Sequence, residues 1–152
     1  MNNKISMYKI ILGLIGFGLF LTTEAYSQRA VSAGSLTFNI SGFADNSGQV
    51  IVQLFRKEDK MPKNPFMQIE AKIVDKKAVV VIKDLSYGFY GAIIVHDQNS
   101  NGIIDHRWGI PNEPLGYTNN WQLSLLSGMP TFEKLKFYFS ESNTICAVQM
   151  HK

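Results

Sequence analysis

The chain has 152 residues and a formal net charge of +3 at pH 7, and 45% of its residues are hydrophobic. Its basic residues are scattered and form no stripe interleaved with aromatic side chains, so the composition argues against nucleic-acid binding. The single cysteine, Cys146, rules out an intramolecular disulfide. Because Cys146 alternates with Val148 and Met150, we expect a buried structural thiol rather than a reactive one.

The N-terminal segment has the three parts of a secretory signal peptide. Two lysines precede an apolar and glycine-containing run over residues 10–21, and Ala-Tyr-Ser at 25–27 places small residues before a cleavage point. The run is shorter than the about 20 apolar residues that a membrane-spanning helix needs. We therefore predict a cleaved signal peptide at 1–27 and one exported domain at 28–152, periplasmic or extracellular and not inserted in the membrane.

Alternating apolar and polar residues predict short strands throughout the exported part. In chain order, the predicted strands lie at 36–40, 50–54, 69–73, 78–83, 88–96, 135–139 and 144–150. Turn-forming residues at 45–48 predict that the first two strands form a hairpin. The strand at 88–96 is apolar on both faces, which is typical of a central strand.

No long segment shows the 3.6-residue period of a helix. The sequence therefore predicts an all-β fold, a seven-stranded antiparallel β-sandwich with one long loop excursion from Asp97 to Thr131. Irregular segments of this length are uncommon in compact domains and are usually functional or disordered. The aromatic residues of the excursion argue against disorder, so it is the predicted functional surface.

Residues 97–105 match the start of a calcium-binding loop. Oxygen-bearing side chains stand at loop positions 1, 3, 5 and 9, and Gly102 stands at position 6, where the chain must turn sharply. The predicted metal ligands are Asp97, Asn99, Asn101, the carbonyl group of Ile103, and Asp105.

Two features of this loop predict weak binding. Position 12 is Trp108 instead of a bidentate glutamate, and only two carboxylates contribute charge unless Glu113 folds back. A dissociation constant of about 10⁻⁴ to 10⁻³ M, as in extracellular modules, is expected. The alternative is that the asparagines and the glycine only shape a self-capped turn.

Other metal and catalytic chemistry has less support. His96 and His106 could join Asp97 or Asp105 in a transition-metal site, but zinc sites usually need three or four protein ligands. His96 more simply ends its strand with a hydrogen bond. No serine lies in a nucleophile-elbow context and no glycine-rich phosphate loop is present, so we predict that the protein is not an enzyme.

Aromatic and amide side chains in the second half of the excursion suggest an alternative function. They could stack on a sugar and bind its hydroxyl groups, which would make a cell-envelope glycan the partner; a protein of the envelope is the other predicted partner class. The rings could equally fill the core. The oligomeric state is left open. The candidate ligand-binding residues are Trp108, Glu113, Tyr117, Asn119, Asn120 and Trp121.

Three runs of the sequence together resemble a known family. They are SGFADNSGQVIVQLF, DLSYGFYGAIIVHD and HDQNSNGIIDHRWGIPNEPLGYTNN. Over residues 36–150 the chain is similar to the secreted bacterial family known as domain of unknown function 2141. The resemblance implies export and a transthyretin-like (prealbumin-like) β-sandwich, and it implies no reaction. The chain departs from the family pattern at Gln98 and Ser100, where acidic residues or glycine are frequent, and this lowers the charge of the loop.

Overall fold

The computed structural model describes residues 32–107, 110–124 and 126–151, so the predicted signal peptide and Trp108 lie outside the described residues. The strands are β1 (Ala33–Ser41), β2 (Gln49–Phe55), β3 (Met67–Ala71), β4 (Lys77–Ser86), β5 (Gly88–Asp97), β6 (His106–Arg107), β7 (Ile110–Pro111), β8 (Leu115–Tyr117), β9 (Phe137–Phe139) and β10 (Ile145–His151). The helices are the 3₁₀ turn η1 (Thr118–Asn120) and the single turn α1 (Phe132–Leu135). No helix in the described ranges is both long enough and apolar enough to cross a membrane.

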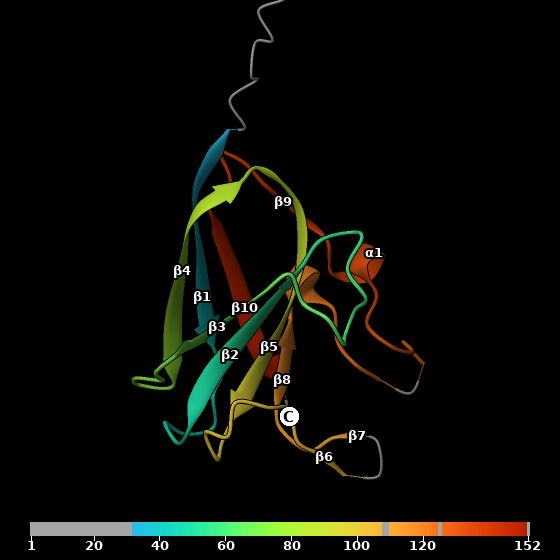
Figure 1. Ribbon diagram of the computed structural model, residues 1–152. Helices are drawn as coiled ribbons and strands as arrows, with labels where there is room; N and C mark the ends of the chain where they lie inside the picture. The colour runs from blue at the N-terminus through green and yellow to red at the C-terminus, as the bar shows by residue number, and fades with distance from the viewer. Residues whose placement is uncertain (1–31, 108–109, 125, 152) are drawn as a thin grey trace, which may run out of the picture.

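The fold is mostly β, with one mixed sheet that is nearly closed into a barrel-like shape (Figure 1). Seven strands follow one another in the order β3-β2-β5-β8-β10-β1-β4, and β9 pairs with β5 outside this path. The edge strands β3 and β4 come close to each other without forming a ladder. β6 and β7 form a separate short hairpin.

The predicted antiparallel sandwich is wrong in its arrangement, although the β-rich class is confirmed. β1 and β10 are parallel, with Thr37 opposite Ile145 and Ser41 opposite Gln149, and the strands belong to one curled sheet. Alternation shows that a strand has one apolar face. It does not show whether that face packs on a second sheet or on the far side of the same sheet.

Three local predictions also need correction. β1 and β2 do not form a hairpin, because β1 pairs with β4 and β10 while β2 pairs with β3 and β5. Leu135 ends α1, so the strand predicted at 135–139 shortens to Phe137–Phe139. The excursion from Asp97 to Thr131 is less irregular than predicted, since it contains β6, β7, β8 and η1.

The apolar residues form two clusters on the two faces of the sheet. The larger cluster fills the interior and includes Phe38, Val52, Ile94 and Phe139. The smaller one lies on the outer face of β2 and β5, where Leu135 of α1 covers it. β5 is therefore buried on both faces, as its sequence predicted.

Cys146 is partly buried, packed against the interior cluster, and this burial raises the pKa of its thiol to about 12. Because the thiolate is the reactive form, the native protein should resist alkylation by iodoacetamide at about pH 8. The same protein unfolded in guanidinium should be alkylated rapidly, as followed by mass spectrometry. Equal alkylation rates in the folded and unfolded states would contradict a buried structural thiol.

Candidate functional site

The loop 97–105 extends from one end of the barrel-like sheet, where β5 ends (Figure 1). Asp97 is the last residue of β5 and lies opposite Gln49, the first residue of β2. A buried central strand therefore fixes the start of the loop. Successive strand residues point to opposite faces, so His96 and Asp97 are directed to different sides of the sheet.

The Asp97 carboxylate organises the first turn of the loop. It is fully buried and accepts hydrogen bonds from the backbone N–H of Asn101 (3.2 Å), the backbone N–H of Gly102 (2.9 Å) and the side chain of Gln49 (2.9 Å). Burial alone would raise the pKa of Asp97, but these hydrogen bonds to the charged form lower it below the ordinary value. Asp97 is therefore an ionised, preorganised carboxylate.

The two asparagines of the loop make the bonds of a self-capped turn. The side-chain oxygen of Asn99 accepts the N–H of Asn101 at 3.1 Å, and the side-chain oxygen of Asn101 accepts the N–H of Ile103 at 2.9 Å. Their amide nitrogens both donate to Asp105, from Asn99 at 2.7 Å and from Asn101 at 3.2 Å. Gly102 has a φ of 79°, as the sharp turn at position 6 requires.

Glu113 folds back onto the loop from the segment before β8. One of its oxygens accepts the N–H of Gln98 and the other accepts the N–H of Asp105, each at 3.2 Å. Burial raises the pKa of Glu113, and the nearby carboxylates of Asp97 and Asp105 raise it further. A third, buried carboxylate thus lies beside the two that the loop itself supplies.

The described residues limit which metals this loop could hold. Within ranges 32–107, 110–124 and 126–151, no three His, Cys, Asp or Glu side chains form a group that could hold a metal ion. A cation here would need oxygen atoms from amide side chains and from the backbone in addition to the carboxylates. Calcium accepts such an all-oxygen set of ligands, whereas zinc prefers nitrogen and sulfur.

The histidines that flank the loop do not join it. The ring nitrogen Nε2 of His96 lies 2.8 Å from the carbonyl oxygen of Ser47, so His96 makes the strand-end hydrogen bond that we expected. His106 is exposed in β6.

The residues of the predicted glycan site are only partly brought together. Tyr117 is buried, and its ring packs edge-to-face on that of Trp121 with centroids 4.7 Å apart. Asn119 donates to the carbonyl group of Lys134, and Asn120 is exposed with a φ of 52°. Trp121 and Tyr117 thus contribute to the outer apolar cluster, while Glu113 belongs to the loop.

Two structural residues of this region were not singled out from the sequence. Gln49 supports Asp97 from the neighbouring strand, and only the strand register could have identified it. Thr118 is fully buried, accepts the N–H of Ala92 at 2.9 Å and donates to the carbonyl group of Leu135 at 2.6 Å. Its position between Tyr117 and two asparagines gave no signal of this role.

These features define a small, barrel-like β domain with an oxygen-rich loop at one end. Residues 38–147 match the family described as "uncharacterized protein conserved in bacteria (DUF2141)", and the chain belongs to that family. The family resemblance seen in the sequence is thereby confirmed. No curated protein and no solved structure matches the chain.

Proposed function

We propose that the protein is an exported, non-catalytic module that binds one calcium ion in the loop 97–105. The ligands are the five residues that the spacing predicts. Glu113 adds a third negative charge beside them, while its two oxygens accept the backbone N–H groups of Gln98 and Asp105. Export rests on the N-terminal segment and on the resemblance of the sequence to a secreted family. The observation that carries the metal proposal is the return of Glu113 to the loop.

Electrostatics supports this proposal. Asp97, Asp105 and Glu113 lie close enough for two of them to raise the pKa of the third, and no salt bridge to them occurs among the described residues. Like charges in a partly desolvated site repel one another. A divalent cation would offset this repulsion, because it is the largest local charge that a site can acquire.

The loop geometry supports an oxygen-coordinated cation as well. The side-chain oxygens of Asn99 and Asn101 are already turned to the loop backbone, where each accepts one N–H. A carbonyl oxygen has two lone pairs, so each can also coordinate a cation. Asp105 would exchange its two amide donors for the ion.

Calcium is expected to raise the melting temperature of the purified protein. At a calcium concentration ten times the dissociation constant, linkage gives about 1.4 kcal/mol. For a domain of this size the shift is about 4–6 °C. Differential scanning calorimetry with calcium chloride, against sodium chloride of equal ionic strength, measures it. Magnesium should shift the melting temperature less, since it requires near-ideal octahedral geometry.

Two variants that each neutralise one carboxylate distinguish calcium binding in the loop from general screening of the protein's charges by the added salt. Asp105→Asn should abolish most of the calcium shift, whereas Asp84→Asn, at an exposed position in β4, should retain it. A shift of equal size with sodium, or in both variants, would end the calcium proposal. Glycan binding by the aromatic residues stays a prediction.

A further inference from the structure

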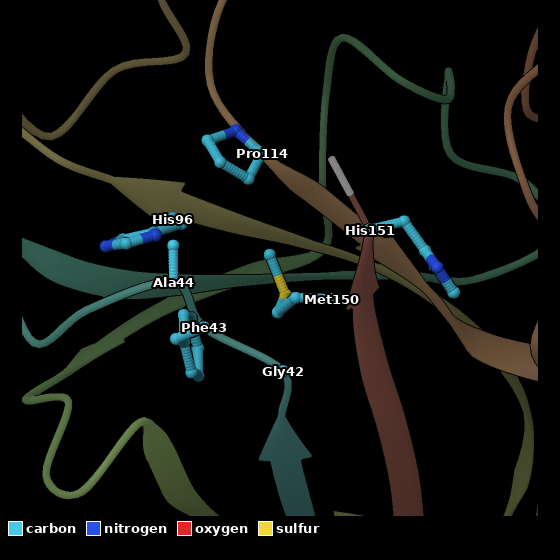
Figure 2. A pocket seen from close by; sticks show the side chains of 7 residues that line it. All are labelled: Gly42, Phe43, Ala44, His96, Pro114, Met150 and His151. Carbon is cyan, nitrogen blue, oxygen red and sulfur yellow. The ribbon is translucent and has the colours of Figure 1, made fainter.

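The strands β10, β1 and β4 are neighbours in the sheet and present one common outer face (Figure 1). Phe38, Val80 and Val148 belong to the interior cluster, so the residues that alternate with them point outward. Figure 2 shows Met150, near the end of β10, on the interior side of the sheet where Phe43 also lies. In the regular part of each of these strands, the odd-numbered residues therefore face outward.

The strand register aligns six of these outward side chains in two uncharged rows across the sheet, Val81, Thr37 and Ile145 in one and Val79, Asn39 and Ala147 in the other. We call these six residues the β4-β1-β10 face. Val79 is 62% exposed and Ile145 is 61% exposed. The outer face of β2 and β5 is covered by α1, whereas these apolar side chains meet solvent. Contiguous exposed apolar surface on a soluble domain marks a contact with another molecule.

Charged residues border the β4-β1-β10 face on its two sides. Lys77 and Lys83 continue the outward alternation of β4 at either end of the two valines, and Asp84 ends that alternation with a φ of 53°. Glu141 is exposed in the turn that leads into β10. Because β10 begins at the first row, this turn lies at the end of the face where Lys83 lies. The β4 side is thus positive, and the β10 side is negative near the turn.

We propose that the β4-β1-β10 face is a dimer interface, on which a second copy of this chain packs sheet against sheet. A twofold axis parallel to β1 places β4 of one copy over β10 of the other. Val81 then packs on the partner's Ile145, and Lys83 approaches the partner's Glu141. The strands of the two sheets run nearly aligned, which is a common geometry for packed sheets.

Charge favours this arrangement over the other twofold arrangement of the same face. An axis across the strands would stack β4 on β4 and bring Lys77 against the partner's Lys83, and like charges repel. The axis parallel to β1 instead brings the positive side of each copy to the negative side of the other. A face with both signs on opposite sides is therefore complementary to its own copy.

Sedimentation equilibrium tests the interface in buffer that contains a calcium chelator, so the result does not depend on the loop 97–105. The purified protein should show a reversible monomer–dimer equilibrium. Val81→Lys should weaken dimerisation at least about tenfold, since the new charge must be desolvated between apolar side chains. Met129→Lys changes an equally exposed apolar residue outside the face and should leave dimerisation unchanged. Circular dichroism checks that both variants keep the β fold.

A charge exchange tests the arrangement of the two copies. Lys83→Glu and Glu141→Lys should each weaken dimerisation about fivefold or more, because the twofold axis repeats each pair. The double variant should recover the wild-type affinity, which a damaged fold could not do. A wild type that is monomeric at every concentration would overturn the proposal and assign the face to a different protein. Dimerisation that Val81→Lys leaves unchanged, or a double variant without recovery, would overturn it as well.

Discussion

Replacing Asp97 by alanine is expected to lower the free energy of unfolding by about 3 kcal/mol or more, even without calcium. The variant leaves two backbone N–H groups and the Gln49 amide without their acceptor at a fully buried position. Hydrogen bonds to a charged acceptor are among the stronger ones, and buried donors without a partner are costly. Urea unfolding followed by tryptophan fluorescence measures the change.

Asp45→Ala is the matched control for this variant. Asp45 also accepts the backbone N–H of a nearby residue, Ser47, but its carboxylate is exposed, so water replaces the lost acceptor. The free energy of unfolding should fall much less in Asp45→Ala than in Asp97→Ala. If the two variants unfold at the same urea concentration, Asp97 does not organise the loop as its contacts indicate.

Acid unfolding supplies a second measure of the same carboxylate. The folded pKa of Asp97 lies below its ordinary value of 3.8, so its stabilisation is present above that pH and is lost as the pH falls through the folded pKa. The wild type should therefore lose more stability on acidification below pH 3.8 than Asp97→Ala does. A parallel loss in both proteins would mean that another group dominates acid unfolding.

Sequence patterns predicted the individual strands better than their partners. Leu36, Phe38 and Ile40 alternate with polar residues and do form a buried face of β1. The parallel partner of that strand, β10, lies more than a hundred residues away along the chain. Nothing in the alternation of either strand encodes direction or partner, and the turn residues at 45–48 suggested a hairpin that long-range pairing overrides.

The outer apolar cluster explains why the sandwich interpretation failed. The second apolar face of the strand at 88–96 was expected to lie in a sandwich of two sheets. Instead, Leu135 of α1 and the rings of Tyr117 and Trp121 cover the outer face of β5 and of its neighbour β2. Short helical turns and loops can therefore take the place of a second sheet. A four-residue helix has too few residues to show a 3.6-residue period, so α1 left no recognisable pattern.

The candidate loop was predictable because its polar side chains are local in sequence. Asp97, Asn99, Asn101 and Asp105 lie within nine residues, and the structure brings them into one turn with hydrogen bonds among them. The contribution of Glu113 depends on how the chain returns after β7, which sequence spacing leaves undetermined. The sequence also could not predict which group His96 bonds to, because the hydrogen bond to Ser47 follows from the register of β2 against β5.

Gly48→Ala is expected to be the second strongly destabilising change, with a loss of about 3 kcal/mol and a fall of about 10 °C in melting temperature. Gly48 has a φ of 67°, which costs a non-glycine residue about 1 kcal/mol. A Cβ atom there would also collide with the carbonyl oxygen of Asp97 and lie 2.7 Å from the Cα atom of Gln98. Both obstacles are backbone atoms, so the start of β2 and the end of β5 would have to move apart.

Gly128→Ala isolates the cost of the collision from the cost of the backbone conformation. Gly128 has nearly the same φ, 65°, but the nearest atom to a new Cβ is Nζ of Lys134 at 3.8 Å, which is an ordinary contact. Gly128→Ala should therefore lower the free energy of unfolding only by the cost of the positive φ, about 1 kcal/mol. The difference between the two alanine variants, measured by calorimetry, gives the cost of the collision between the new Cβ atom and the backbone of Asp97 and Gln98. Equal losses would mean that the loop can move away from β2 at no cost, and a rigid, preorganised loop could then no longer be assumed for calcium binding.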